Sequence, residues 1–168
     1  MGDLLQALQA VVVKDTLDLT ELEPAYVDPE TKKELTLEFR LNWTRGQKDR
    51  QRALQQETFE LQMRYGDLKD LVEDEEKWRA EREELERLSE ENWRGWAGFW
   101  AGVLLMEVEE AMGMAEAIPE QHWVWITQQV SVRAKEYEEA AVKKAGEPRS
   151  RTSGKPRARR RSSGKKQT

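Results

Sequence analysis

The chain lacks cysteine and contains a single histidine, His122. Without cysteine, disulfide frameworks, thiol nucleophiles and thiolate metal sites are excluded, and nothing favours an oxidising compartment. One histidine cannot supply the paired Glu-x-x-His motifs of a di-iron helical bundle. The Walker lysine motif, the dinucleotide-binding glycine motif, the nucleophile elbow and the EF-hand loop are also missing. The sequence therefore predicts a protein that is not an enzyme and holds no cofactor and no metal.

The sequence also lacks the apolar run of about 20 residues that a membrane-spanning helix requires. Its most apolar stretch, WRGWAGFWAGVLLM from Trp93 to Met106, is shorter, contains Arg94 and is followed at once by Glu107. At the N-terminus, Gln6 and Gln9 interrupt the apolar residues and no basic charge precedes them, so no signal peptide is indicated. We therefore expect no membrane partner and a cytoplasmic protein, located in the host cytoplasm if the source is viral.

Charge is abundant and unevenly distributed along the chain. Charged residues make up 36% of the sequence, and the net charge is −5. Residues 149–168 carry nine lysines and arginines and no acids, which leaves a net charge of about −14 on the residues before them. Because residues 148–168 contain almost nothing apolar to bury, we predict that they form a disordered basic tail.

The basic tail can bind nucleic acid or another anionic partner through its cations, and such binding would weaken with salt. The residues proposed for this contact are Arg157, Arg159, Arg160, Arg161, Lys165 and Lys166. A second interpretation remains open, in which the tail is a solubilising segment that folds loosely onto the acidic body.

Residues 35–44, LTLEFRLNWT, alternate between apolar and polar side chains, as in a strand that is buried on one face. Residues 23–27 are the expected partner strand, and Asp28 and Pro29 offer turn chemistry between the two. We therefore predict a hairpin over residues 23–44. A third short strand at residues 11–13 would support it, because an isolated hairpin is only marginally stable.

Helical patterns follow the hairpin. Thr44 and Gln47 have the spacing of a capping box, which predicts a helix that begins after Thr44 and ends at Gly66. Asp67 is the expected cap of a second helix, whose narrow apolar stripe runs to Leu88.

Two further boundaries are expected beyond Leu88. Ser89 is expected to begin the tryptophan-rich segment. Pro119 is expected to begin the last helix, with His122 in its first turn and Gly146 at its end.

Together these patterns predict an α+β fold that is mostly α-helical, with an N-terminal β-hairpin or small sheet packed on a helical body. Residues 1–44 form the sheet region and residues 45–147 the helical body, the two making one domain. Residues 148–168 form the tail.

The tryptophan-rich segment has two distinct faces if it is a helix. At about 100° per residue, Trp93, Trp96, Trp100 and Leu104 form a ridge. Three glycines, Gly95, Gly98 and Gly102, lie on the opposite side. Each glycine costs about 1 kcal/mol relative to alanine in a helix, and close packing of a neighbouring helix is the usual reason to keep one.

Two interpretations of this segment stay open. In one it is the central, fully buried helix of the domain. In the other the tryptophan ridge is partly exposed and binds a partner helix, since aromatic residues are enriched at interface anchors. Stacking on nucleic acid bases is disfavoured, because the acidic body would repel phosphates.

The stretch DPETKKELTLEFRLNWTRGQ, followed by a charged helical body, the sequence IPEQHWVWI and a low-complexity end, resembles the tail assembly chaperones of long-tailed bacteriophages. The resemblance implies a late protein that binds the apolar helical tape measure protein and promotes assembly of tail tube subunits around it. It also implies absence from the finished virion, and in several members a frameshift near the C-terminus makes a longer product.

We accordingly expect a non-enzymatic chaperone whose client is a tape measure protein or a tail tube subunit. One alternative is a nucleic-acid-associated or packaging protein that acts through the basic tail. Another is a structural helical oligomer built from copies of this chain.

Overall fold

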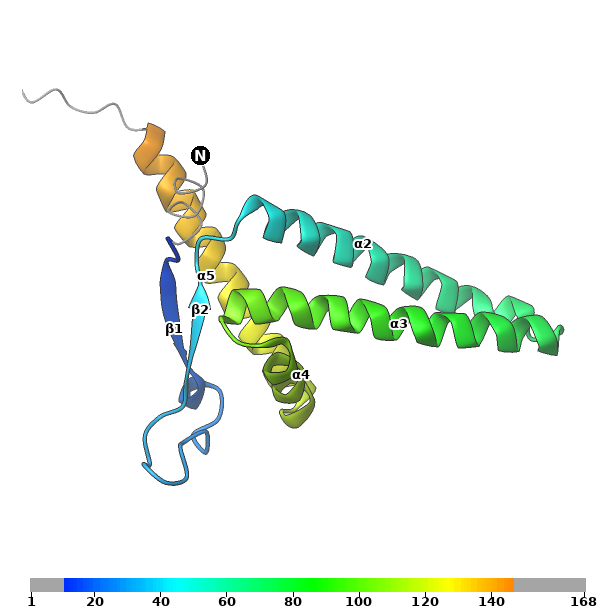
Figure 1. The fold of residues 1–168 in the computed structure, drawn as a ribbon, viewed down its shortest axis with the longest axis horizontal. Helices are drawn as coiled ribbons and strands as arrows, with labels where there is room; N and C mark the ends of the chain where they lie inside the picture. Colours follow the sequence, from blue (N-terminus) through cyan, green and yellow to red (C-terminus); the bar gives the residue numbers. More distant parts are fainter. Residues whose placement is uncertain (1–10, 147–168) are drawn as a thin grey trace, which may run out of the picture.

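A computed structural model describes residues 11–146 of the chain, and residues 1–10 and 147–168 lie outside the described part. The α+β, mostly helical fold class is confirmed: a small sheet packs against one end of a set of helices (Figure 1). In chain order the elements are β1 (Lys14–Asp18), the 3-10 turn η1 (Leu19–Glu21), β2 (Thr36–Arg40), α2 (Arg45–Asp67), the 3-10 turn η2 (Leu68–Leu71), α3 (Glu75–Leu104), α4 (Val108–Ala117) and α5 (Glu120–Gly146).

The sheet consists of β1 and β2, which pair in antiparallel register. Leu17 lies opposite Leu37, and both side chains are buried together with that of Phe39. The predicted alternation over β2 is therefore correct, since Leu37 and Phe39 face the core while Thr36 and Glu38 are exposed.

The predicted partner of β2 was wrong. Residues 23–27 form no strand, and only an isolated bridge between Val27 and Glu34 closes the loop that joins β1 to β2. Pro24 has no N–H to donate to a ladder, and the N–H of Tyr26 bonds the carbonyl of Glu23 at 2.9 Å, which makes this segment a turn. Residues 11–13 precede β1 and are not themselves a strand.

The strand-to-helix junction matches its prediction. Thr44 is the N-cap of α2 and accepts a hydrogen bond from the N–H of Gln47 at 3.1 Å. The side chain of Gln47 accepts one from the N–H of Thr44 at 2.9 Å, so both halves of the capping box are present. The box fixes where β2 ends and α2 starts.

Helices α2 and α3 lie side by side and form an arm that extends away from the sheet (Figure 1). Two boundaries in this arm differ from those predicted. Asp67 caps nothing with its side chain, and the cap of α3 is Asp74, which accepts a hydrogen bond from the N–H of Lys77. Ser89 does not begin a helix, because α3 is continuous from Glu75 to Leu104 and the ion pair of Arg87 and Glu91 spans this position.

Beyond Leu104 the helix stops at a residue that the sequence did not single out. Leu105 adopts the left-handed conformation with φ of 56°, and the N–H of Met106 bonds the carbonyl of Ala101. A separate helix, α4, therefore lies between the tryptophan-rich segment and Pro119. As predicted, α5 starts after Pro119, with His122 in its first turn.

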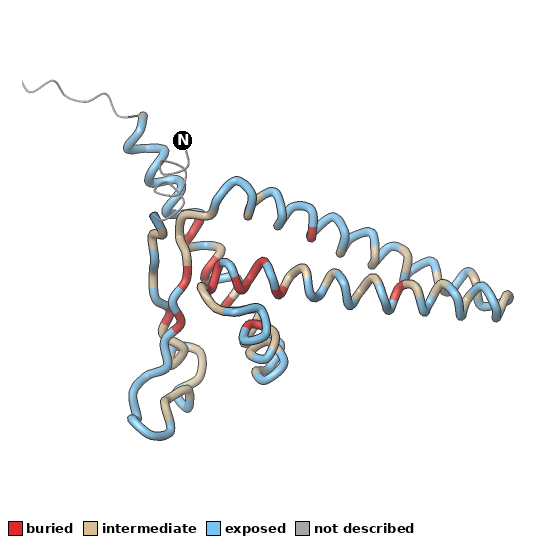
Figure 2. Tube along the Cα trace, viewed as in Figure 1, coloured by how far each residue is buried: buried red, intermediate tan, exposed pale blue. Residues whose placement is uncertain are grey.

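Buried residues gather where the sheet, the C-terminal end of α3 and helix α5 meet, whereas most of the arm is exposed (Figure 2). One cluster joins side chains from the sheet, α2, α3 and α5, so the described parts of residues 1–44 and 45–147 share a core. Its members are Leu17, Leu37, Phe39, Leu54, Phe99, Trp100, Val103, Leu104, Ile126 and Val130. No helix between residues 11 and 146 is both long and apolar enough to cross a membrane.

Candidate interaction surfaces

Half of the predicted tryptophan ridge belongs to the core. Trp100 is only 7% exposed and Leu104 only 2%. The Trp100 ring meets the rings of Phe99, Trp43 and Trp123 edge-on, with centroids 5.0, 6.2 and 6.3 Å away. Such pairs stabilise a core beyond the area that they bury. The hypothesis that Trp100 and Leu104 bind a partner is therefore wrong for this fold, because the protein's own core uses them.

The other half of the ridge becomes progressively more exposed toward the arm. Trp96 is half-buried, and its indole N–H donates to the hydroxyl of Thr58 on α2 at 3.0 Å. Trp93 is 36% exposed. Of the four ridge residues, Trp93 is thus the one that stays available to a partner.

The glycine face meets α2, but at only one point is the approach tight. A Cβ at Gly95 would lie 2.7 Å from both Cδ2 of Leu54 and Nη2 of Arg50. A Cβ at Gly102 would lie 3.6 Å from the side chain of Gln47, and one at Gly98 would meet nothing within 4 Å. Close helix packing therefore explains Gly95, while Gly98 lies open on the surface.

The arm carries exposed apolar side chains that sequence reasoning missed. Phe59 and Met63, one turn apart on α2, are 58% and 55% exposed. Gln55 and Gln62, on the same side of the helix, are exposed and uncharged. We call Phe59 and Met63 the arm pair. The sequence could have indicated this surface, because both residues lie off the apolar stripe of α2 that contains Leu54. A second apolar stripe on one helix indicates that a second neighbour packs against it.

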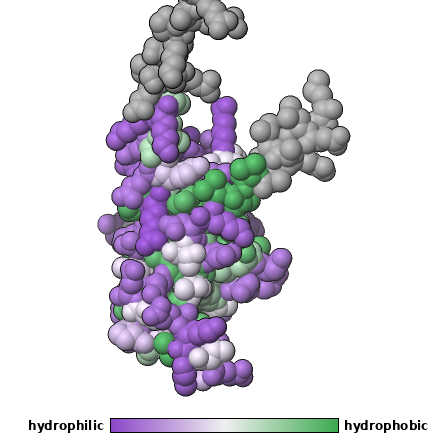
Figure 3. All heavy atoms as spheres, turned by 90° about the vertical axis from the view of Figure 1, so that its left-hand side faces the viewer, coloured by the Kyte–Doolittle hydropathy of each residue, from purple (hydrophilic) through white to green (hydrophobic). Residues whose placement is uncertain are grey.

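Charge on the described surface is segregated. No lysine or arginine occurs between Arg94 and Arg133, and five exposed glutamates lie in this interval on α4 and at the start of α5. They are Glu107, Glu109, Glu110, Glu116 and Glu120. The face turned to the viewer in Figure 3 is mostly hydrophilic, with an apolar area in its upper half. The described surface thus has an acidic region on α4 and at the start of α5.

Carboxylates at turns and caps have lowered pKa values. The hydroxyl of Thr20 donates to Asp18, and the side chain of Lys77 donates to Asp74, and each hydrogen bond holds the pKa of that carboxyl below its usual 3.8. Because the folded pKa is lowered, the stabilisation is complete above the unfolded pKa and is lost as the pH falls through the folded one. These groups stabilise local structure and lie away from the tryptophan segment.

Besides the core packing of Ile126 and Val130, three polar side-chain contacts among the described residues hold α5 against the rest of the fold. His122 Nδ1 and the hydroxyl of Tyr26 share a hydrogen bond of 2.7 Å. Arg133 forms an ion pair with Asp15 at 3.3 Å and donates to the carbonyl of Thr16. The third contact is the ion pair of Lys48 and Glu138, which joins α2 to α5. His122 therefore has a structural partner that sequence spacing could not indicate.

Removing the Tyr26 hydroxyl should measure the His122 contact. We expect Tyr26→Phe to lower the free energy of unfolding by about 1 kcal/mol, because a half-buried hydrogen bond is lost while the ring stays. Urea unfolding followed by circular dichroism measures this. Tyr137→Phe is the matched control, since no hydrogen bond of that hydroxyl is found within residues 11–146. If both changes lower the free energy of unfolding equally, the hydrogen bond between Tyr26 and His122 does not stabilise the fold.

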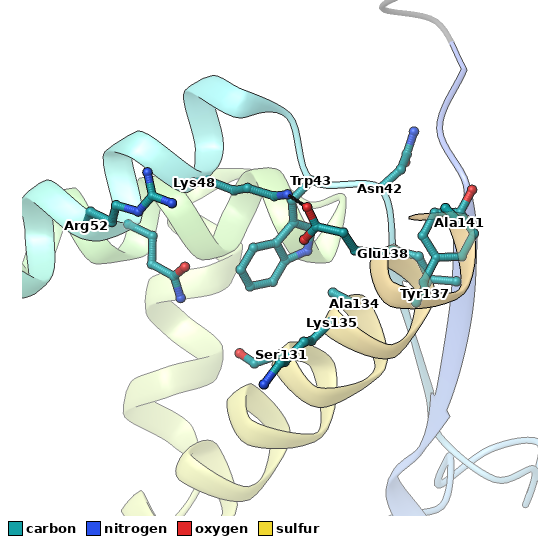
Figure 4. Close-up of a pocket in the computed structure, with 12 residues that line it drawn as sticks. Asn42, Trp43, Lys48, Arg52, Ser131, Ala134, Lys135, Tyr137, Glu138 and Ala141 are labelled. Atoms are coloured by element: carbon teal, nitrogen blue, oxygen red, sulfur yellow. Dashed lines mark hydrogen bonds and ion pairs between the residues drawn. The ribbon is translucent and has the colours of Figure 1, made fainter. Parts of the chain in front are cut away.

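A partly apolar groove lies between the junction of β2 with α2 and the C-terminal half of α5 (Figure 4). Its volume is about 440 Å³, and the ion pair of Lys48 and Glu138 crosses it. We call it the α5 groove. It is lined by Leu41, Asn42, Trp43, Lys48, Gln51, Arg52, Ser131, Ala134, Lys135, Tyr137, Glu138 and Ala141.

The remaining predicted site residues, Arg157, Arg159, Arg160, Arg161, Lys165 and Lys166, lie outside the described residues, as does the predicted disordered tail. Among residues 11–146, no group of three or more histidine, aspartate or glutamate side chains is placed to hold a metal ion. Comparison with protein-family models, with curated proteins and with solved structures gave no match, so the surfaces described above carry the functional argument.

Proposed function

We propose that this protein is a non-enzymatic tail assembly chaperone of a long-tailed bacteriophage. It binds the apolar helical tape measure protein and promotes assembly of tail tube subunits around it. The proposal places it in the host cytoplasm and makes it absent from the finished virion. The observation that carries the proposal is the arm pair, since Phe59 and Met63 stand exposed on a helix that projects beyond the core.

The arm pair supports the proposal through the hydrophobic effect. Both side chains are more than half exposed, so covering them with an apolar client helix gains roughly 1–2 kcal/mol each. The two residues are one turn apart, which is the spacing of anchors when one helix packs along another. Trp93, on α3, offers a third exposed apolar side chain.

The acidic surface supports the same proposal. The exposed glutamates of α4 give the chaperone a net negative region that has no basic residue from Gly95 to Val132. A strongly charged surface keeps a complex soluble while an apolar client is held elsewhere on the molecule.

Co-expression tests this function. The proposal expects a tape measure protein to be encoded downstream of this chain's gene. That protein is expressed together with this chain, and the soluble fraction of the client is measured after centrifugation. We expect the double variant Phe59→Glu with Met63→Glu to reduce soluble client to the level found without chaperone, because two charges replace the apolar anchors. Both side chains are exposed, so the fold should remain intact by circular dichroism.

The double variant Gln55→Glu with Gln62→Glu is the control for that experiment. It adds the same charge to the same exposed side of α2 but leaves the apolar pair in place. Client solubility should stay at the unmodified level. If both variants lose the client equally, or if neither does, the arm pair is not the client surface.

Two alternatives give different results with the same proteins. A nucleic-acid-associated protein would bind DNA through residues 149–168, with an affinity that falls steeply with salt and disappears when those residues are removed. The cations at the start of α2 do not add to this alternative, because Arg45 and Arg52 pair with Asp49 and Lys48 pairs with Glu138. A structural oligomer would appear as a mass in solution that falls to the monomer in the arm-pair variant.

A further inference from the structure

We propose that the exposed face of the first half of α5 is the interface of a symmetric dimer. In this dimer the α5 helices of two copies pack antiparallel, with Gln128 at the two-fold axis. We call the residues Gln121, Val124, Gln128 and Val132 the α5 face. The contact needs no client, so it stands independently of the chaperone function.

One side of α5 is buried and the opposite side is exposed. Ile126 and Val130 are 1% and 0% exposed and belong to the core. At about 100° per residue, the α5 face lies on the other side of the helix. All four of its residues are exposed, Val124 by 42% and Val132 by 51%. Residues 11–146 therefore leave the α5 face largely uncovered.

The α5 face carries no charge over about three turns of helix. Residues 121–132 contain no aspartate, glutamate, lysine or arginine, in a chain that is 36% charged. On α3, by contrast, every exposed residue from 75 to 94 is charged except Ala80 and Trp93. Because charged side chains are depleted at the centres of protein interfaces, the uncharged α5 face indicates a protein neighbour.

The order of residues on the α5 face is self-complementary, as a two-fold axis requires. Val124 and Val132 each lie four residues from Gln128, so in an antiparallel pair Val124 of one copy meets Val132 of the other. Gln128 meets its own copy at the axis. A side-chain amide can bond its own copy because it both donates and accepts hydrogen bonds, whereas two glutamates or two lysines would repel. These matches favour a second copy of this chain as the occupant.

The charges at the two ends of the α5 face also complement each other. Glu120 precedes the face and Lys135 follows it. Within residues 11–146 the ion pairs of α5 are those of Arg133 and Glu138, so Glu120 and Lys135 have none. The side chain of Lys135 points away from Glu138 (Figure 4). In the antiparallel pair Gln121 lies opposite Lys135 of the other copy, which brings Glu120 beside that lysine at both ends of the interface.

The overlap is short, so the dimer should be weak. Residues 120–135 span about 24 Å along the axis of a helix that is about 10 Å wide. Such a contact is smaller than the roughly 800 Å² per partner of a standard interface. We therefore expect the dimer to dissociate at micromolar concentrations, on the order of 10 µM.

Analytical ultracentrifugation of the full-length chain, from about 1 to about 200 µM, tests the dimer. The unmodified protein should pass from monomer to dimer as its concentration rises. The double variant Val124→Glu with Val132→Glu should remain monomeric, because the added acids face one another across the interface. Both side chains are exposed, so the fold should remain intact by circular dichroism.

The arm-pair variant Phe59→Glu with Met63→Glu is the matched control. It adds the same charge at exposed apolar side chains on a different surface and should dimerise as the unmodified protein does. The proposal is overturned if the unmodified protein is monomeric throughout. It is also overturned if the dimer survives the change at both valines, or if it is lost in the control.

Charge reversal tests the antiparallel arrangement. Glu120→Lys and Lys135→Glu should each weaken the dimer by about tenfold, because like charges then meet at both ends of the interface. The variant that carries both changes restores opposite charges and should dimerise within about threefold of the unmodified protein. If the combined variant is no better than the single ones, the helices do not pair in this way and the proposal fails.

Disulfide trapping locates the two-fold axis, because the native chain has no cysteine. Gln128→Cys should form a disulfide-linked dimer under mild oxidation, since this residue meets its own copy. Gln121→Cys alone should not, because it lies opposite Lys135, but a mixture of Gln121→Cys with Lys135→Cys should link. Equal linkage by Gln128→Cys and Gln121→Cys alone would contradict the proposed axis.

Discussion

Trp100→Ala is expected to lower the free energy of unfolding by about 3–5 kcal/mol, the largest effect that we anticipate for a single change in this chain. The side chain is 7% exposed and touches three other aromatic rings, so its removal leaves a cavity in the core. Small domains are stable by only 5–15 kcal/mol, so this variant should be largely unfolded well below the melting temperature of the unmodified protein.

Trp93→Ala is the matched control, on the same helix and of the same chemistry. Its side chain is 36% exposed, so less buried surface is lost than at Trp100, and we expect a smaller loss of about 1–2 kcal/mol. Urea unfolding followed by far-ultraviolet circular dichroism measures both. If Trp100→Ala is too unstable to purify, Trp100→Phe keeps an aromatic ring in the cluster and should still lose more than Trp93→Ala. Losses of equal size at the two positions would contradict the division of the ridge into buried and exposed halves.

The second large effect is a difference in sign between two glycines three residues apart. Gly95→Ala should destabilise the protein by about 1–3 kcal/mol, because its Cβ would lie 2.7 Å from the buried side chain of Leu54, and either that side chain or the helix must shift. Gly98→Ala should instead stabilise by up to about 1 kcal/mol, since an added Cβ meets nothing within 4 Å and alanine favours the helix.

Thermal unfolding of the two alanine variants measures this difference directly. Gly113→Ala on α4 is a second open position, because its Cβ also meets nothing within 4 Å, and it should behave like Gly98→Ala. In a Leu54→Ala background, Gly95→Ala should cost less than it does in the unmodified protein, because the side chain in the way has been shortened. If Gly95→Ala is stabilising, α2 and α3 do not approach as closely as the structure places them.

Local signals in the sequence predicted the features that depend on neighbouring residues. The capping box of Thr44 and Gln47, the strand alternation around Phe39 and the helix start after Pro119 depend on residues a few positions apart. Each is determined by backbone chemistry within one turn of helix or one strand, so the sequence is enough to locate it.

Features that depend on distant partners were not predictable in this way. β1 contains one buried apolar residue, Leu17, between Thr16 and Asp18, so only its pairing with β2 identifies it as a strand. The sequence showed the two faces of α3. Which tryptophan is buried, however, depends on which part of α3 the sheet and α5 pack against. Trp100 lies within this region, whereas Trp93, two turns earlier, is beyond it.

The position of α5 has a consequence for how the chain folds. Its contacts with Asp15, Tyr26 and Lys48 join residues 118, 96 and 90 positions apart in the sequence. Contacts between residues so far apart in the sequence form slowly, because closing the intervening loop costs conformational entropy before the contacts stabilise the fold. During synthesis α2 and α3 can pair with each other early. The contacts between the sheet and α5 can form only after α5 has left the ribosome. Because Val130 is the last member of the core cluster, every residue of that cluster leaves the ribosome before the residues that follow Gly146.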